Sequence, residues 1–170
     1  MRHILVAMLS FIPSAVVLGL AALVSLYLAN TWPSPVEAAH ERRAASRALA
    51  VAVVLQGIHF GEEALTGLPE RLGPLFGLPQ MSYSFFVLFN LTWLGIWLAS
   101  IKGLTSRSSG AFFAAWFLAI AGVLNGIAHP LLAVRTSGYF PGLVTSPFVG
   151  LASAWLGYRL LGATRTTSNG

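Results

Sequence analysis

The chain of 170 residues contains no cysteine and no aspartate, and 9% of its residues are charged. The absence of cysteine excludes disulfide bonds, thiolate metal sites and a cysteine nucleophile, and it leaves the redox compartment undetermined. The scarcity of charge excludes an ordinary soluble domain, in which about 25% of residues are charged. Lys and Arg residues are scattered beside apolar runs, so the net charge of +5 indicates membrane topology and not nucleic-acid binding.

Hydrophobic residues make up 56% of the chain, which predicts an all-α, polytopic membrane protein with a single domain over residues 1–170. A membrane-spanning helix needs about 20 predominantly apolar residues. The runs that meet this requirement are 4–29, 46–66, 83–101, 111–134 and 139–161. The first run is longer than the apolar core of a signal peptide, which has about 7–15 residues. We therefore predict that it is retained as a span.

The segments between these runs predict the orientation of the chain. One side receives Arg2, Arg71 and Arg135, whereas the other receives Arg42, Arg43, Arg47, Lys102, Arg107, Arg159 and Arg165. Because cytoplasmic loops are enriched in Lys and Arg, we predict a cell-membrane protein with an external amino terminus and a cytoplasmic carboxyl terminus. The linker 65–82 alternates Pro and Gly with Leu and Phe, which is typical of an interfacial connecting loop, of a short re-entrant segment or of a lid.

An unusual polar stretch, His59-Phe60-Gly61-Glu62-Glu63, ends the apolar run 48–60. Two of the five acidic residues stand here side by side, close to a histidine. At about 100° per residue, the histidine and both glutamates fall on one side of a helix, and Gln56 extends that face by one turn. Ionisable groups at membrane depth are costly and mark functional sites. The stretch therefore predicts one wall of such a site.

Polar residues recur at the same level on the next three predicted spans. Asn125 and His129 lie four residues apart on one face of the fourth run, and Asn90 lies in the first half of the third. Tyr139 opens the fifth run. Since consecutive spans alternate in direction, all of these residues fall in the outer half of the bundle. We predict that the second to fifth spans enclose a shared site there.

Two pairs of glycines predict close helix packing. Gly122 and Gly126 project on the polar side of the fourth run, and a small-xxx-small pair permits a neighbouring helix to approach closely. Gly57 and Gly61 form a similar pair on the second run, roughly opposite its polar face. We therefore expect a close helix contact beside the polar face of the fourth run and behind that of the second.

The polar positions form three motifs: His59 to Glu63 matches HxxEE, Asn125 to His129 matches NxxxH, and Tyr139-Phe140-Pro141-Gly142 matches YxPG. In this order on successive apolar runs, they resemble the HXXEE family of small integral membrane proteins, over about residues 46–161. The resemblance implies a helical membrane domain. It suggests an enzyme but supplies no reaction. The family is usually described with four spans, so the run 4–29 is an additional one.

The first chemical interpretation of the site is a metal centre. Imidazole and carboxylate are ordinary ligands of Zn, Fe and Mn, and we favour Zn or Fe. His59 and Glu63, at positions i and i+4, can reach one ion, and so can His59 and Glu62, at i and i+3. His129 from a facing helix completes two histidines and one carboxylate. This set is typical of hydrolytic Zn and of non-haem Fe(II).

The remaining polar groups are predicted to act on the substrate. The glutamate that does not bind metal is then available as general base. Asn125 can orient a ligand or donate to a developing oxyanion, and Tyr139 can serve as an acid or as a substrate hydrogen-bond donor. The predicted substrate contacts are Gln56, Asn90, Trp93 and Trp97. The favoured function is a membrane-embedded enzyme that hydrolyses or oxidises a lipophilic substrate or a membrane lipid.

Several alternatives remain open. Without a metal, Glu62 and Glu63 cannot both ionise cheaply, so one carboxyl keeps a proton and acts with His59 as an acid–base isomerase or cyclase. A Glu/His relay also suits a proton- or cation-coupled transporter, and two facing histidines suit haem. A purely structural network is less economical, because hydrogen bonds between membrane helices average only about 0.6 kcal/mol.

Overall fold

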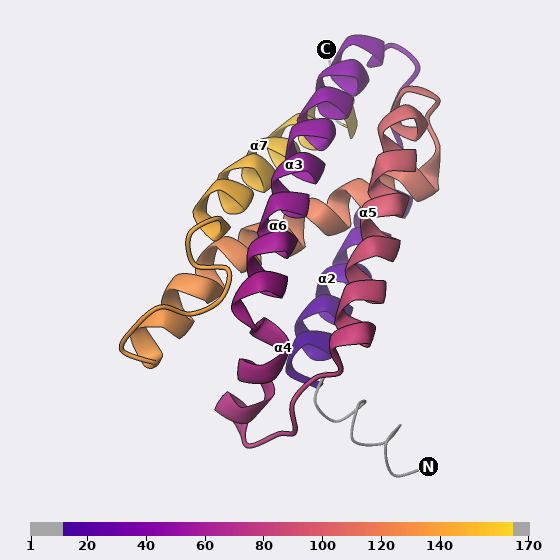
Figure 1. Cartoon of the computed structure of the whole chain (residues 1–170). Helices are drawn as coiled ribbons and strands as arrows, with labels where there is room; N and C mark the ends of the chain where they lie inside the picture. Colours follow the sequence, from indigo (N-terminus) through magenta and orange to yellow (C-terminus); the bar gives the residue numbers. More distant parts are fainter. Residues whose placement is uncertain (1–11, 165–170) are drawn as a thin grey trace, which may run out of the picture.

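The computed structural model describes residues 12–164, and over that range it contains helices and turns but no strand (Figure 1). The elements are α2 (Ile12–Thr31), α3 (Ala39–Thr66), α4 (Leu68–Arg71), the 3₁₀ helix η1 (Gly73–Phe76), α5 (Tyr83–Thr105), α6 (Ser109–Arg135) and α7 (Ser146–Thr164). The predicted all-α fold is confirmed. The expectations for Arg2, Arg165 and the first residues of the run 4–29 lie outside the described residues.

Helices α2, α3, α5 and α6 are long and apolar enough to cross a membrane, so the chain is an integral membrane protein. They overlap the predicted runs 4–29, 46–66, 83–101 and 111–134. The fifth run, 139–161, begins later than predicted, because α7 starts at Ser146. Pro141 lacks a backbone N–H and Gly142 has a φ of 87°, so neither residue continues a helix. Helix α7 has 19 residues, among them Arg159, and does not belong to the four long apolar helices.

The helices form a bundle in which α3 and α5 lie side by side and α6 crosses them obliquely (Figure 1). Helix α7 packs along α3 and α6, and α2 packs along α6. Helix α3 ends at Gly67, whose φ of 82° lets its N–H bond back to the carbonyl of Glu63. The short elements α4 and η1 follow at the same end of the bundle (Figure 1). This end carries the polar stretch of α3.

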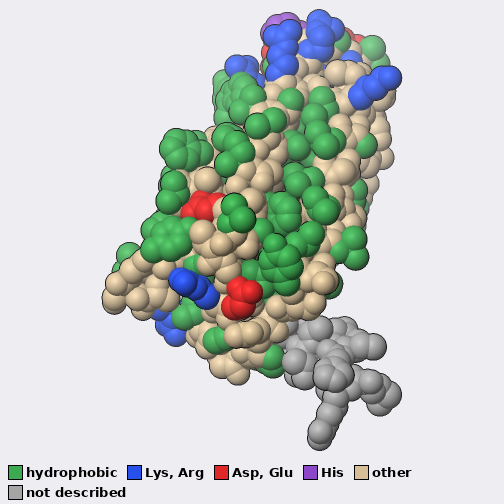
Figure 2. All heavy atoms as spheres, viewed as in Figure 1, with side chains coloured by type: hydrophobic (Ala, Val, Ile, Leu, Met, Phe, Trp, Pro, Cys, Tyr) green, Lys and Arg blue, Asp and Glu red, His purple; other side chains and the backbone are tan. Residues whose placement is uncertain are grey.

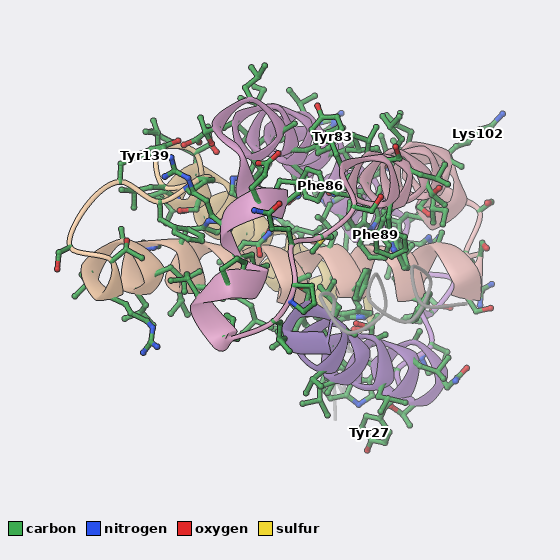
Figure 3. All side chains as sticks on the ribbon, turned by 60° about the horizontal axis from the view of Figure 1, so that its bottom comes forward. Tyr27, Tyr83, Phe86, Phe89, Lys102 and Tyr139 are labelled. Atoms are coloured by element: carbon green, nitrogen blue, oxygen red, sulfur yellow. The ribbon has the colours of Figure 1, made fainter. Side chains whose placement is uncertain are left out.

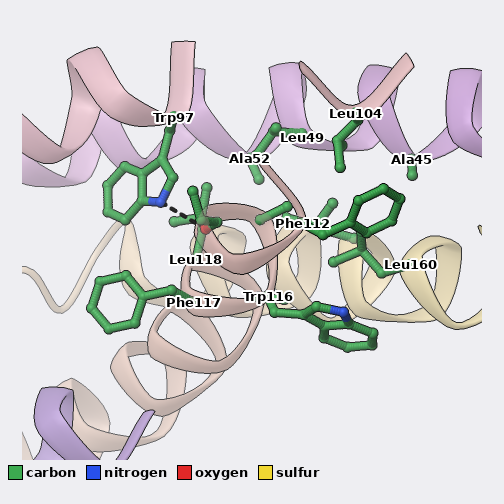
Figure 4. Packing of buried hydrophobic residues seen from close by; sticks show 14 of the residues in the cluster. Ala45, Leu49, Ala52, Trp97, Leu104, Phe112, Trp116, Phe117, Leu118 and Leu160 are labelled. Carbon is green, nitrogen blue, oxygen red and sulfur yellow. Dashed lines mark hydrogen bonds between the residues drawn. The ribbon is translucent and has the colours of Figure 1, made fainter. Parts of the chain in front are cut away.

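The larger apolar core joins buried residues of α2, α3, α5, α6 and α7, part of which Figure 4 shows. Small residues along α3 let the neighbouring helices approach closely. The core includes Ala45, Leu49 and Ala52 of α3, Trp97 and Leu104 of α5, Phe112, Trp116, Phe117 and Leu118 of α6, and Leu160 of α7. The indole N–H of Trp97 donates to the carbonyl of Ala114 over 2.9 Å. The large ring is thus buried with its polar atom satisfied.

Glycines hold α6 and α7 at close range. A Cβ added to Gly126 would lie 2.8 Å from the Cα of Gly150. A Cβ added to Gly122 would lie 1.9 Å from the Oγ of Ser153. The close approach predicted for Gly122 and Gly126 is therefore confirmed, and α7 is the neighbouring helix. Because His129 follows on α6, this contact helps to place it near the start of α7.

The close contact predicted behind α3 is wrong. A Cβ added to Gly61 would meet no atom within 4 Å, and one added to Gly57 would only reach a leucine side chain at 4.0 Å. Helix α3 instead packs against α5 and α7 through its alanines. A helical wheel gives the direction of a face but not the distance to a neighbour.

This difference predicts opposite effects for two matched substitutions. Gly126→Ala should destabilise the protein by about 1–3 kcal/mol, because its methyl group meets backbone atoms of α7 that cannot move aside. Gly61→Ala should leave stability unchanged or raise it by up to about 1 kcal/mol, because alanine is the better helix former and the space is open. Thermal denaturation of both variants in detergent measures the difference. Equal melting temperatures would contradict the packing of α6 on α7.

The two ends of the molecule differ in charge. Lys and Arg side chains gather at the end opposite α4, and apolar side chains cover the flank between the two ends (Figure 2). The end with more Lys and Arg carries Arg42, Arg43 and Arg47 of α3, Lys102 of α5, Arg159 of α7, and Arg107 between α5 and α6. Arg71 and Arg135 lie at the other end, where α4 and α6 end. The candidate site lies toward this less basic end.

Candidate metal centre

His59, Glu63 and His129, the three predicted metal ligands, meet inside the bundle. These residues are buried, with exposed fractions of 0% for His59, 6% for Glu63 and 5% for His129. The Nε2 atom of His59 lies 3.3 Å from Glu63 Oε1, and the Nε2 atom of His129 lies 3.2 Å from the same oxygen. The candidate ligand atoms all lie within 4.8 Å of one another. The spacing on α3 and the facing position on α6 thus bring these residues together as predicted.

The tautomer of His129 follows from its second nitrogen. Its Nδ1 atom lies 2.6 Å from the carbonyl oxygen of Pro141. A carbonyl oxygen can only accept, so Nδ1 must carry the proton and donate it. The Nε2 atom of a neutral His129 therefore presents a lone pair to Glu63. A backbone carbonyl on the far nitrogen is the usual way in which a metal-binding imidazole is oriented.

The tautomer of His59 follows from a chain of two hydrogen bonds. The hydroxyl of Thr145 donates its single proton to Glu62 Oε2 over 2.5 Å. The Nδ1 atom of His59 lies 2.7 Å from the same hydroxyl oxygen, which can then only accept. His59 therefore also carries its proton on Nδ1 and presents the lone pair of Nε2. This buried Nε2 makes no hydrogen bond within the described structure.

Two lone pairs and a carboxylate oxygen thus point at one another. Such an arrangement is repulsive unless a cation or an additional proton lies among the three atoms. At bond lengths of about 2.0–2.1 Å, tetrahedral ligand atoms are about 3.3 Å apart. Two of the three separations, 3.3 and 3.2 Å between the imidazole nitrogens and Glu63 Oε1, match that spacing, and all the ligand atoms lie within 4.8 Å of one another. The arrangement suits a small divalent metal ion.

Gly142 lies against both imidazole rings. A Cβ at this position would stand 2.5 Å from Cε1 of His129 and 2.8 Å from Cε1 of His59. The residue also has a φ of 87°, which L-amino acids with a side chain rarely adopt. At this position the loop before α7 therefore touches the two rings through backbone alone, and glycine is required by both space and conformation.

Glu62 points away from the centre, although it precedes Glu63 directly. Its carboxylate accepts hydrogen bonds from the hydroxyl of Tyr139, the backbone N–H groups of Val144 and Thr145, and the Thr145 hydroxyl. These donors stand just before the start of α7, where N–H groups lack partners within the helix. The sequence predicted a free general base, but these bonds leave Glu62 as the residue that positions the loop from Tyr139 to Thr145.

Tyr139 shares this position outside the centre. Its side chain is 44% exposed, and its hydroxyl lies 2.7 Å from Glu62 Oε1. Partial burial and the Glu62 carboxylate raise the pKa of the Tyr139 phenol. In Figure 3 it lies on one side of the end of α3, whereas Phe86 and Phe89 of α5 lie on the other. Tyr139 does not line the cavity described next. Its role as an acid or substrate donor stays a prediction.

A cavity of about 110 Å³ lies on the other side of Glu63. Its walls come from α2, α3, α4, α5 and α6. They include the carboxylate of Glu63, the amide side chains of Gln56, Asn90 and Asn125, and the rings of Phe86, Phe89, Trp93, Trp97 and Phe117. The structure thus gathers the predicted substrate contacts around one hollow. Their role in substrate binding stays a prediction.

Thr145 belongs to the centre but is absent from the sequence prediction. It is the hydrogen-bond link between Glu62 and His59. One local signal was available, since Thr145-Ser146-Pro147 resembles the start of a helix, with hydroxyl residues before a proline. That signal places Thr145 at the end of the bundle where His59 lies. It does not indicate that the hydroxyl meets an imidazole.

Comparisons with known proteins add no family or activity to this geometry. No family model, curated protein or solved structure matches the chain. Only the residues of the centre and the cavity therefore indicate what the protein does.

Proposed function

We propose that the chain is a membrane-embedded metalloenzyme that acts on a lipophilic substrate. One observation carries the proposal: the hydrogen bonds of both imidazoles direct two Nε2 lone pairs at a single oxygen of Glu63. Three acceptors that converge in a buried site need a positive charge, and a divalent ion supplies it with the observed spacing. Zn or Fe(II) suits two histidines and one carboxylate.

The centre suits hydrolysis or oxidation. A bound ion would polarise a substrate oxygen or lower the pKa of a water, as metal ions do in enzymes. His59, Glu63 and His129 would hold the ion. The amides of Gln56 and Asn125 stand in the adjoining cavity beside Glu63, where they can orient a polar group of the substrate. Glu62, through Thr145, keeps His59 in the tautomer that binds metal.

The location of the site supports a substrate that arrives from the membrane. Aromatic rings of α5 and α6 line the cavity, and the helices around it are apolar enough to lie in a bilayer. The end of the bundle with more Lys and Arg lies opposite the site. By the positive-inside rule, this supports an orientation in which the centre lies in the external half of the cell membrane. The resemblance to the HXXEE family is part of this proposal, because its motif histidines and second glutamate are the residues that converge.

Metal analysis tests the proposal directly. Detergent-purified protein, reconstituted with Zn, Mn or Fe(II), should contain about one ion per chain, as expected for a single three-ligand centre. His59→Ala and His129→Ala should each lose this ion, because removal of one ligand leaves two. His40→Ala is the matched control, since His40 lies at the basic end next to Glu41. Thermal denaturation verifies that each variant is folded.

A folded wild-type protein without metal after reconstitution would contradict the proposal. It would favour acid–base chemistry, because the same lone pairs would then require a proton shared between Glu63 and one imidazole. Nitrogen-15 NMR of the histidines separates the two cases. A metal-bound Nε2 shifts without titrating, whereas an imidazolium shows two protonated nitrogens that respond to pH.

A further inference from the structure

The cavity beside Glu63 combines an aromatic wall with a small set of amide groups. Gln56 is buried, with an exposed fraction of 6% for the whole residue, and its amide makes no hydrogen bond within the described structure. The amide of Asn125 also lacks a partner there. Asn90 uses one N–H for the carbonyl of Phe86, 2.9 Å away, which leaves its amide oxygen free. Gln56 is buried, whereas Asn90 and Asn125 are half-buried. Amide groups in such positions lose free energy when they have no hydrogen-bond partner, so these groups point to a ligand with donors and acceptors of its own.

Glu63 connects this cavity to the metal centre. Its Oε1 atom faces both imidazoles, whereas its Oε2 atom has no hydrogen bond or ion pair with a described residue. Glu63 lines the cavity, but neither histidine does. A ligand in the cavity would therefore meet the second oxygen of Glu63 with the imidazoles behind it.

The charge of the lining restricts the ligand. Among the described residues that line the cavity, Glu63 is the only ionisable one, and none is Lys, Arg or His. A carboxylate or phosphate would be buried beside Glu63 without a counter-charge, which is strongly unfavourable. With a divalent ion bound, the centre carries a net positive charge, which repels an ammonium group. An uncharged polar group avoids both penalties.

The volume restricts how much of the ligand enters. A cavity of about 150 Å³ holds benzene, and this one has about 110 Å³. It therefore encloses a compact head group, such as an alcohol, ketone, epoxide or amide with a few carbons. The apolar remainder of the molecule must lie outside the cavity, where the bundle contacts lipid.

We infer that the cavity binds the uncharged polar end of a lipophilic molecule, which the amides of Gln56, Asn90 and Asn125 hold against Glu63. This inference deepens the proposed function, because it names the substrate class of the same site. The exclusion of cations rests on the proposed metal. The exclusion of anions rests on the lining residues alone.

Tryptophan fluorescence can test the inference with three probes that share one apolar group. Trp93 and Trp97 line the cavity, and bromine quenches tryptophan on contact. When metal-loaded protein in nanodiscs is titrated with 4-bromobenzyl alcohol, its tryptophan fluorescence should be quenched in a saturable way. 4-Bromobenzoate should bind about 100-fold more weakly, because its charge is buried unpaired. 4-Bromobenzylammonium should also bind more weakly than the alcohol. Trp93→Phe combined with Trp97→Phe should remove the saturable component.

Matched variants locate the bound probe. Gln56→Leu and Asn125→Leu should each weaken the alcohol about 2- to 10-fold, the effect of one lost hydrogen bond. Gln80→Leu is the control, since Gln80 is an exposed amide outside the cavity. Absence of saturable quenching by the alcohol, equal binding of the benzoate, or tighter binding of the ammonium would each overturn the inference.

Metal analysis of the same samples separates this inference from the proposed function. Selective binding of the alcohol by protein that takes up no metal on reconstitution would support the cavity ligand and contradict the metal centre. A stoichiometric metal with the same affinity for all three probes would retain the metal centre and refute the ligand class.

Discussion

Gly142→Ala should abolish metal binding while the helical bundle remains folded. The new methyl group would stand 2.5 Å from Cε1 and 2.6 Å from Nδ1 of His129, and 2.8 Å from Cε1 of His59. Both rings would have to move, so neither Nε2 would stay aimed at Glu63. The φ of 87° at Gly142 adds strain, because alanine rarely adopts it. One substitution that removes no ligand thus disturbs two ligands at once.

We expect metal affinity to fall about 100-fold or more. This is the largest loss usually seen when a residue that orients a metal ligand is replaced. Titration of metal-free protein with Zn, compared with His129→Ala, measures it. Gly138→Ala is the matched control in the same loop, because a Cβ there would have only one neighbour, 4.0 Å away. Wild-type affinity in Gly142→Ala would show that the loop does not determine the positions of the imidazoles.

The sequence predicts the helices well because membrane spans are long and apolar. It predicts the start of α7 poorly. Residues 139–145 are as apolar as the helix that follows, so hydropathy does not separate loop from helix. The boundary between loop and helix depends on the backbone of Pro141 and Gly142. It also depends on the Glu62 carboxylate of α3, which accepts from the N–H groups before α7. Such a long-range partner has no signal in local composition.

The candidate centre is predictable to the level of helix faces. Spacing places His59 and Glu63 on one face, and alternating direction places His129 at the same level. Periodicity cannot choose between Glu62 and Glu63, because both lie near that face. The tertiary contacts determine which glutamate is the candidate metal ligand. Glu63 contacts the imidazole of His129, and Glu62 contacts the loop that ends at Thr145.

Glu62→Gln should weaken metal binding about 10- to 100-fold, although Glu62 does not reach the metal centre. The carboxylate accepts hydrogen bonds on both oxygens. An amide replaces one of those oxygens with a donor that faces the N–H groups of Val144 and Thr145 or the Tyr139 hydroxyl. The loop should therefore loosen, and hydrogen exchange at Thr145 should accelerate. Glu70→Gln, at an exposed glutamate of α4, is the control for the loss of a negative charge.

Thr145→Val tests whether Glu62 acts on the metal centre through the loop backbone or through the Thr145 hydroxyl that contacts His59. Valine has nearly the same shape and keeps the backbone N–H that donates to Glu62. It removes the hydroxyl, which accepts from His59 Nδ1 and donates to Glu62 Oε2. If Glu62 acts through this hydroxyl, Thr145→Val should weaken Zn binding about 10-fold without faster hydrogen exchange in the loop, and Thr145→Ser should restore it. Wild-type affinity in Thr145→Val combined with a loss in Glu62→Gln would assign the whole effect to the loop backbone. Because His59 has no other partner for Nδ1 in the described structure, the relay through Thr145 is the one that fixes its tautomer.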